Sequence, residues 1–182
     1  MNHPKVIVVG TGRSGTSTVA RILHEHFHIC MGHYLKPPDH ANPLGFYEDF
    51  LVHGLLQQVV EGGMSPSIVL HNLNLMHAGC EVWGLKNNWI LEGPLALLQT
   101  LAPELVIRTW RPLGKTVQSW VQKEVRRGRS VSQINEDSFV ELCLRRESQM
   151  DSKLKYFNVL TIRFDRQIPE EELIEGIGNC LC

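Results

Sequence analysis

Short runs of apolar, mostly β-branched residues alternate along the chain with longer segments in which apolar residues recur at helical spacing. The runs predict buried strands at 5–9, 82–85, 105–109 and 159–164. The longer segments predict helices at 15–28, 49–60, 93–101, 114–126, 137–154 and 169–180. Apolar strands that alternate with helices favour right-handed crossovers and a parallel sheet. We therefore expect an α/β fold, a three-layer sandwich with a central parallel sheet, in one domain over residues 1–182.

Two stretches of the chain lack this alternation. Residues 31–45 are rich in Pro, Gly and His and predict an irregular segment. A glycine-rich break is expected at 61–67, and the pattern gives no element between this break and the strand at 82–85.

Composition narrows the class of protein without naming a function. Of the 182 residues, 43% are hydrophobic and 20% are charged, as in ordinary soluble domains. The net charge of -1 argues against a general nucleic-acid binder. No apolar run approaches the length of a membrane span, and the N-terminus has no signal-peptide core, so we expect no membrane partner and a cytoplasmic location. The five cysteines are scattered and odd in number, which predicts reduced thiols.

The first predicted strand leads into a glycine-containing loop and then a helix. This arrangement forms an anion cradle, because glycines allow a tight bend and the amides at the helix start face the ligand. The spacing of Gly10 and Gly15 matches a nucleoside-triphosphate loop, but Thr16 stands where that loop has lysine. The positive charge lies inside the loop instead, at Arg13. The candidate ligands of a phosphate-like group, bound without a metal, are Gly12, Arg13, Ser14, Gly15, Thr16 and Ser17.

A second strand, loop and helix repeat this chemistry. Arg111 follows the strand at 105–109, and Ser119 lies eight residues further on, inside the next helix. An arginine and a hydroxyl so placed can bind a second phosphate. Arg13, Lys86 and Arg111 each end or follow a predicted strand, so we expect all three along one crevice at the carboxyl ends of the sheet. An ordinary turn at the first loop, and a solvated Ser119 at the second, are the structural alternatives.

With these motifs in hand, the sequence resembles the sulfotransferases that use 3′-phosphoadenosine 5′-phosphosulfate (PAPS). The segment 12–17 resembles the family's 5′-phosphosulfate loop, and 111–119 resembles its 3′-phosphate motif. Asn-Pro-Leu-Gly-Phe-Tyr-Glu at 42–48, Trp-Gly-Leu-Lys at 83–86 and the late strand at 158–165 are similar to further family segments, in family order. The resemblance covers nearly the whole chain.

This resemblance implies a P-loop NTPase-like sulfotransferase architecture and an enzyme with PAPS as co-substrate. The acceptor would be a hydroxyl or amine of a small molecule or carbohydrate, and no metal is expected. Arg111 directly precedes Pro112, where the family has an intervening residue, so Arg108 could bind the 3′-phosphate instead. The family's late Arg-Lys-Gly loop is absent, and Asn88 follows Lys86 where cytosolic animal members have the catalytic histidine.

Roles in transfer follow from these positions. Arg13 and its loop would neutralise charge on the leaving side, and Lys86 would stabilise the bridging oxygen or bind the acceptor. Glu48 is the expected general base, since it closes the family-like segment and could face the sulfate across the cleft. Asp49 is the second candidate base, and His33 or His40 is a more remote one. A surface lysine at 86, and a helix-start charge at Glu48, are the structural alternatives.

Three other functions fit parts of the sequence. His-Glu-His-Phe-His at 24–28 satisfies the H-E-x-x-H motif of zinc proteases. A P-loop nucleotide or small-molecule kinase fits the glycine spacing but requires Mg²⁺ and normally the absent lysine. A non-catalytic nucleotide-binding module would bind the same ligand without turnover. The sequence fixes neither the acceptor nor the oligomeric state.

Overall fold

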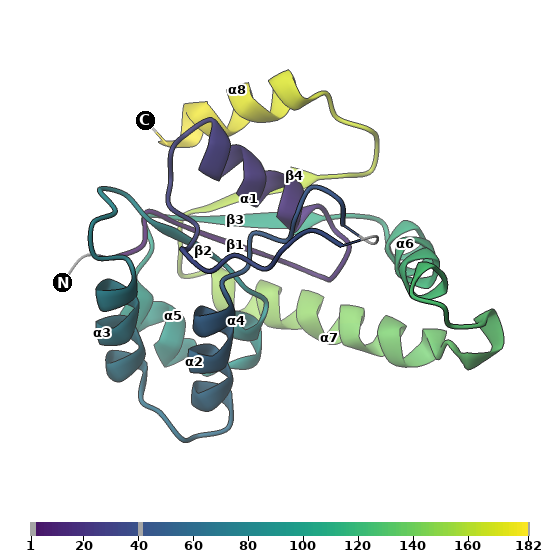
Figure 1. Ribbon diagram of the computed structural model, residues 1–182, viewed down its shortest axis with the longest axis horizontal. Coiled ribbons are helices and arrows are strands. Elements are labelled where there is room, and N and C mark those ends of the chain that lie inside the picture. Colours follow the sequence, from purple (N-terminus) through teal and green to yellow (C-terminus); the bar gives the residue numbers. More distant parts are fainter. Residues whose placement is uncertain (1–2, 40–41, 182) are drawn as a thin grey trace.

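A four-stranded parallel sheet forms the centre of the computed structural model, which describes residues 3–39 and 42–181 (Figure 1). The strands are β1 (Val6–Gly10), β2 (Gly84–Lys86), β3 (Leu105–Trp110) and β4 (Val159–Arg163). Their order across the sheet is β2-β1-β3-β4. Every residue of β1 is buried, as expected of a β-branched central strand covered on both faces. The carboxyl ends of β1 and β3, which are not consecutive in the chain, therefore lie side by side.

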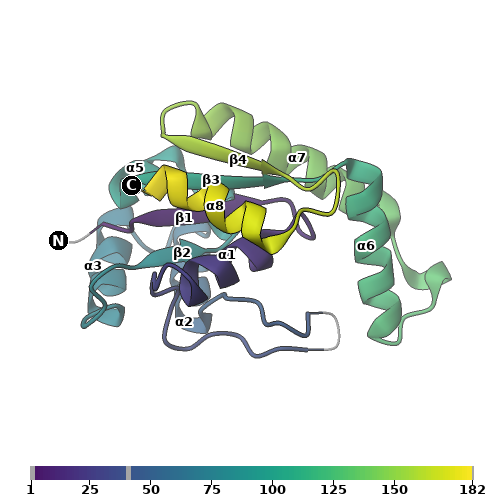
Figure 2. The ribbon, with the colours of Figure 1, turned by 90° about the horizontal axis from the view of Figure 1, so that it is seen from above.

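Helices cover both faces of this sheet (Figures 1 and 2). One face carries α1 (Thr16–Glu25) and α8 (Glu170–Leu181). The other face carries α2 (Phe50–Val60), α3 (Pro66–Met76), α4 (Trp89–Glu92), α5 (Leu95–Leu101) and α7 (Glu136–Leu154). Helix α6 (Leu113–Arg126) lies beyond the carboxyl end of β3 and is followed by the short turn η1 (Val131–Gln133). The predicted α/β fold with its three layers and central parallel sheet is thus confirmed.

Two hydrophobic clusters hold the layers together, one on each side of the sheet. Side chains alternate along a strand, so Val6 and Val8 face the α1–α8 side while Ile7 and Val9 face the other side. Burying one such aliphatic side chain stabilises the fold by about 1.5–3 kcal/mol. None of the helices in the described residues combines the length and apolar character that crossing a bilayer needs.

The largest differences between the predicted and the observed elements concern three helical regions. Helix α1 ends at Glu25 and not at residue 28. The predicted helix at 93–101 begins only at Leu95, because the chain is extended at Gly93 and Pro94, and the short helix α4 before it was not predicted. Helix α3 was not predicted at all, although Pro66 at its first turn and buried residues at helical spacing mark it.

Candidate functional site

The loop between β1 and α1 is tightly built against its neighbours. Gly15 caps α1 with a φ of 99°, and a Cβ there would lie 2.5 Å from the ring of Phe164. A Cβ at Gly10 would lie 2.3 Å from Oγ1 of Thr109. Arg13 also has a left-handed backbone, with a φ of 70°. Only a narrow set of residues fits this loop, which presents the start of α1 to the crevice.

The Ser14 side chain stabilises the loop by buried hydrogen bonds and does not face the crevice. Its side chain is fully buried, and its Oγ donates to the Thr11 carbonyl at 2.6 Å and lies 2.7 Å from Oγ1 of Thr109. Its amide also donates to Thr11. The expectation that Ser14 binds a ligand directly therefore does not fit this arrangement. Gly12 also lies near Phe139, since a Cβ at this position would be 3.8 Å from the Phe139 ring, and it does not line the cavity described next.

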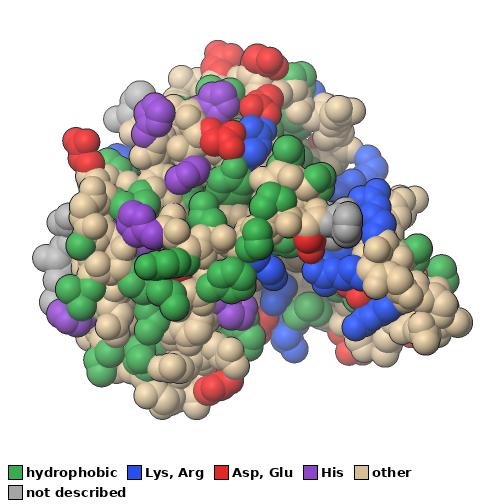
Figure 3. Space-filling model, viewed as in Figure 1, with side chains coloured by type: hydrophobic (Ala, Val, Ile, Leu, Met, Phe, Trp, Pro, Cys, Tyr) green, Lys and Arg blue, Asp and Glu red, His purple; other side chains and the backbone are tan. Residues whose placement is uncertain are grey.

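Arg13, Arg111 and Ser119 come together as the sequence predicts. The Arg13 Nε donates to Ser119 Oγ at 3.3 Å, and the Arg111 guanidinium donates to the Arg13 carbonyl at 3.3 Å. Burial, followed by the nearby Arg111 charge, lowers the pKa of Arg13. Figure 3 shows Lys and Arg side chains gathered on the side of the molecule where α6 lies. This concentration of positive charge favours an anionic ligand.

These residues surround a cavity of about 200 Å³ at the carboxyl ends of β1 and β3. Its lining consists of four loop and helix-start residues, two arginines and two further polar residues. The lining residues are Arg13, Gly15, Thr16, Ser17, Thr18, Asn42, Arg111 and Ser119. None of them is acidic, so the cavity combines cationic side chains, hydroxyls and helix-start amides, which is the chemistry of a phosphate or sulfate site.

A larger cavity of about 620 Å³ adjoins the first, since Gly15, Thr18 and Arg111 line both. Its far wall comes from the loop between β4 and α8, and includes the ring of Phe164. Lys115 fixes this loop by donating from Nζ to the Asp165 carbonyl at 2.5 Å. An anion site joined to a partly apolar cavity of this size suits a nucleotide. The sequence analysis missed Thr18 and Lys115, although Lys115 lies one helical turn after Arg111.

Arg108 lies away from this crevice. Its guanidinium pairs with Glu147 and, at 2.7 Å, with Asp151, both on α7. The alternation of β3 explains this, because Arg108 follows Val106 onto the face that α7 covers. The suggestion that Arg108 binds the 3′-phosphate is therefore wrong, and Arg111 is the arginine beside the loop.

Lys86 and Glu48 form an ion pair next to the loop. The Lys86 Nζ donates to Glu48 Oε1 at 2.6 Å, to the Phe46 carbonyl at 2.9 Å and to Ser17 Oγ at 3.2 Å. Lys86 is only 6% exposed, so it is not a surface lysine. Burial lowers the pKa of Lys86, and the Glu48 carboxylate opposes this shift. The pair connects the predicted base to the anion loop through one ammonium group.

Asp49 is a helix cap and not a base. Its carboxylate is buried and accepts from the amide of Leu51 at 2.8 Å, which caps α2. The second oxygen accepts from the amides of His33 and Tyr34 at 3.0 and 2.9 Å. These bonds occupy both oxygens, so the suggestion of Asp49 as second base is wrong. His40 lies outside the described residues.

The H-E-x-x-H segment does not form a protease-type metal site. Because α1 ends at Glu25 and His28 has a φ of 54°, the two histidines are not one turn apart on a helix. His24 Nδ1 instead lies 3.3 Å from the Ile29 carbonyl. Glu25 pairs with Arg21 at 2.8 Å, which removes it as a free base. The zinc-protease alternative is therefore wrong.

No protein-family model and no curated protein matches this chain. Solved structures do share its fold. Deoxyadenosine kinase from M. mycoides with bound dATP superposes with a TM-score of 0.52 at 15% identity, covering 97% of this chain and 98% of that chain. A candidate kinase from Chloroflexus aurantiacus gives a TM-score of 0.56 at 14% identity, covering 98% of each chain. At this identity the likeness establishes the fold alone, an α/β architecture with a central parallel sheet that this chain shares with these kinases.

Proposed function

We propose that this chain is a nucleotide-dependent transferase that moves a sulfuryl group from PAPS to a hydroxyl or amine acceptor. The observation that carries the proposal is the small cavity, where Arg13 and Arg111 meet the start of α1 without a lining carboxylate. Nucleoside triphosphates are normally bound as Mg²⁺ complexes, and Mg²⁺ requires oxygen ligands that usually include a carboxylate. An anion bound by arginine, hydroxyl and amide groups alone fits the phosphosulfate of PAPS better.

The two adjoining cavities suit two parts of that nucleotide, the small one its anionic groups and the larger one its nucleoside. In the proposed complex, Arg13, Gly15, Thr16 and Ser17 bind the 5′-phosphosulfate. Arg111 and Ser119 bind the 3′-phosphate, because they line the same cavity from α6 and the loop before it. The larger cavity, with the Phe164 ring, receives the nucleoside.

The transfer step requires a proton acceptor and charge stabilisation on the leaving side. The acceptor oxygen attacks sulfur in line, the bond between sulfur and the bridging phosphate oxygen breaks, and adenosine 3′,5′-bisphosphate leaves. Glu48 takes the proton from the acceptor hydroxyl. Lys86, held between Glu48 and Ser17, orients this carboxylate and stabilises the developing charge at the bridging oxygen.

A P-loop kinase is the second candidate function. The solved structures that share the fold favour it, since they are described as a deoxyadenosine kinase and a candidate kinase. Two features of the site argue against a kinase, one in the loop after β1 and one at the end of β2. Thr16 replaces the lysine that binds the β- and γ-phosphates, and the carboxyl end of β2 carries Lys86 where a metal-binding acid would suit a kinase.

The substitution Glu48→Gln tests the proposed chemistry. We expect the rate of bisphosphate release from PAPS, with a simple phenol or an amino sugar as acceptor, to fall about 10²–10⁴-fold. Binding of adenosine 3′,5′-bisphosphate should stay within a few-fold of the wild type. Glu147→Gln is the matched control, because it makes the same chemical change on α7, away from the crevice, and should leave the rate unchanged.

Three results would contradict the proposal in different ways. Full turnover by Glu48→Gln would remove Glu48 as the base. Mg²⁺-dependent phosphoryl transfer from ATP, without turnover of PAPS, would establish the kinase alternative. Tight binding of the bisphosphate without any transfer to a broad acceptor panel would point to a non-catalytic module.

A further inference from the structure

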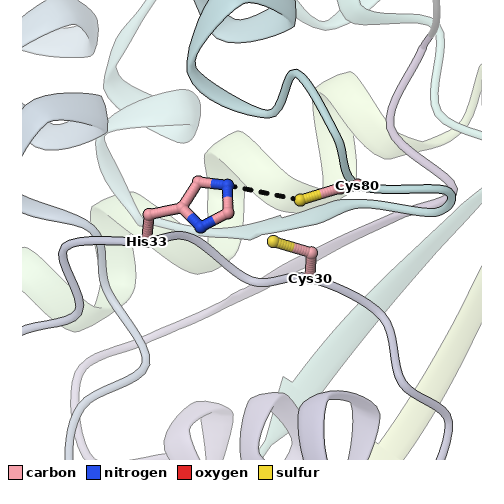
Figure 4. Close-up of side chains that lie close together, drawn as sticks. All are labelled: Cys30, His33 and Cys80. Carbon is pink, nitrogen blue, oxygen red and sulfur yellow. Dashed lines mark hydrogen bonds between the residues drawn. The ribbon is translucent and has the colours of Figure 1, made fainter.

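Three metal-ligating side chains converge at a place that the proposed transfer does not use. The Cys30 and Cys80 sulfurs and a ring nitrogen of His33 all lie within 4.8 Å of one another. Figure 4 shows the three side chains pointing toward a common centre, and the Cys80 Sγ lies 3.4 Å from His33 Nε2. Within the part of the chain that the structure describes, this is the one group of at least three His, Cys, Asp or Glu side chains whose ligand atoms lie so close together.

The backbone fixes Cys30 at the edge of the sheet. Its amide donates to the Val82 carbonyl at 3.0 Å, and its carbonyl accepts from the Gly84 amide at 3.0 Å. These bonds form a parallel bridge with Trp83 that prolongs the β2 edge. The Cys30 thiol is therefore presented from a rigid element and not from a free loop.

The other two ligands are also anchored. The His33 amide donates to the buried Asp49 carboxylate at 3.0 Å, which ties this residue to the start of α2. The Cys80 amide donates to the His77 carbonyl at 2.9 Å, in the turn that follows α3. Three separate segments thus hold three ligands in place before any ion binds, which lowers the ordering cost of binding.

We propose that Cys30, His33 and Cys80 bind a single Zn²⁺ ion, with water in the fourth position. Two thiolates and one imidazole are the soft and borderline ligands that Zn²⁺ selects. A tetrahedral ion with zinc–sulfur bonds of about 2.3 Å places its ligand atoms roughly 3.8 Å apart. The observed separations, all within 4.8 Å, allow this geometry with side-chain rotation alone.

Binding exchanges protons for the metal. Zinc binds thiolates, so the proton of each thiol would pass to solvent when the ion binds. The bound ion would join the segment that leads from Cys30 toward Glu48 to the turn after α3. Its expected effect is to hold these two segments together, and it does not depend on the transfer reaction.

Metal titration of the full chain tests this site. The reduced protein should bind one equivalent of Zn²⁺, and Co²⁺ in its place should give a thiolate-to-cobalt charge-transfer absorption. Cys30→Ser, Cys80→Ser and His33→Gln should each weaken Zn²⁺ affinity by more than about 100-fold, because loss of outer partners alone costs about 10- to 100-fold. Cys180→Ser, at an exposed thiol on α8, is the matched control and should bind as the wild type does.

A second measurement does not require the variants to fold. Zinc added to the wild-type chain should raise its melting temperature, and a chelator should reverse the rise. Less than one equivalent of zinc in the reduced wild type, or unchanged affinity in Cys30→Ser, would overturn the proposal. So would a Cys30–Cys80 disulfide that persists under a thiol reductant, because that bond removes both sulfur ligands.

Discussion

Two arginines three residues apart have opposite surroundings. Arg108, on β3, pairs with Glu147 and Asp151 of α7. Arg111, just after β3, donates to the Arg13 carbonyl and makes no ion pair with any described residue. The first charge is neutralised inside the fold, whereas the second lies beside another arginine. Charge that a fold leaves uncompensated at a concave surface indicates a binding site, and compensated charge indicates structure.

The two arginines should also differ in whether they affect ligand binding or protein stability. The proximity of Arg111 contributes to the lowered pKa of Arg13, which means that the two charges repel each other in the ligand-free chain. A bound anion would relieve that repulsion, so ligand binding should stabilise the protein. The Arg108 side of the sheet has no such dependence. Substitutions on the two sides should therefore separate into losses of binding and losses of stability.

Closing the crevice should have the largest effect. Gly15→Ala places a Cβ into the Phe164 ring at a backbone φ of 99°, so we expect a loss of about 2–4 kcal/mol of unfolding free energy. Chemical denaturation measures this loss. Binding of adenosine 3′,5′-bisphosphate should also disappear, since Gly15 lines both cavities. Gly114→Ala, at an open position on α6, is the control and should be nearly neutral. A stable Gly15→Ala chain that binds the bisphosphate normally would refute this account of the loop.

Removing the uncompensated charge should weaken binding. Arg111→Ala deletes the proposed charge-assisted bond to the 3′-phosphate, and a bond of this kind is worth about 1.5–3 kcal/mol. Titration calorimetry should show affinity for adenosine 3′,5′-bisphosphate falling about 10- to 100-fold, while affinity for 5′-AMP changes little. The unfolding free energy should stay the same or rise, because Arg13 loses a repulsive neighbour. Equal losses for both nucleotides would place the 3′-phosphate elsewhere.

Removing the compensated charge of Arg108 should lower stability and leave nucleotide binding unchanged. Arg108→Ala leaves Glu147 and Asp151 without their partner, so we expect about 1 kcal/mol less stability and unchanged nucleotide affinity. The figure is small because Asp151 is well exposed, with 68% of its side chain in solvent. The same denaturation and calorimetry experiments check both halves of this statement. Weakened nucleotide binding in Arg108→Ala would erase the contrast between the two arginines.

The Cys143 thiol, on α7, should make a pH-dependent contribution to stability. Burial raises the pKa of the Cys143 thiol to about 11, above its ordinary 9.0. The unfolded chain loses this proton first, so the stabilisation is complete below pH 9 and is lost as pH rises toward 11. At pH 10 the loss should be about 1 kcal/mol relative to pH 8. Denaturation of wild type and Cys143→Ala at both pH values measures it, and a parallel pH profile in the variant would contradict the assignment.

The sequence predicts the parts of this molecule that depend on local pattern. The β-branched run at 6–9 and the glycines at 10 and 15 are sufficient to place a strand and the tight loop that leads into α1. Helix α3 was not predicted because the glycine-rich break at 61–67 includes its N-cap Ser65 and its first residue Pro66. Its buried Val69, Leu70 and Leu73 lie at helical spacing, so the signal was present.

The finer features of the site depend on contacts that no local pattern encodes. Which of Arg108 and Arg111 faces the crevice depends on the strand register and on the position of Glu147 on α7. The bond between Lys86 and Glu48 joins a strand end to an irregular segment 38 residues away, and no local pattern determines that path. Ser14 looked like a ligand because hydroxyls suit anions, whereas its burial shows a structural use.

The most direct test of the central claim compares two nucleotides on the wild-type chain by titration calorimetry at one ionic strength. The account predicts that adenosine 3′,5′-bisphosphate binds at least about 10-fold more tightly than ATP with Mg²⁺, since each charge-assisted phosphate bond is worth about 1.5–3 kcal/mol. Its affinity should not change when a chelator removes divalent ions. Tighter binding of ATP with Mg²⁺ would contradict the account and assign the crevice to a kinase.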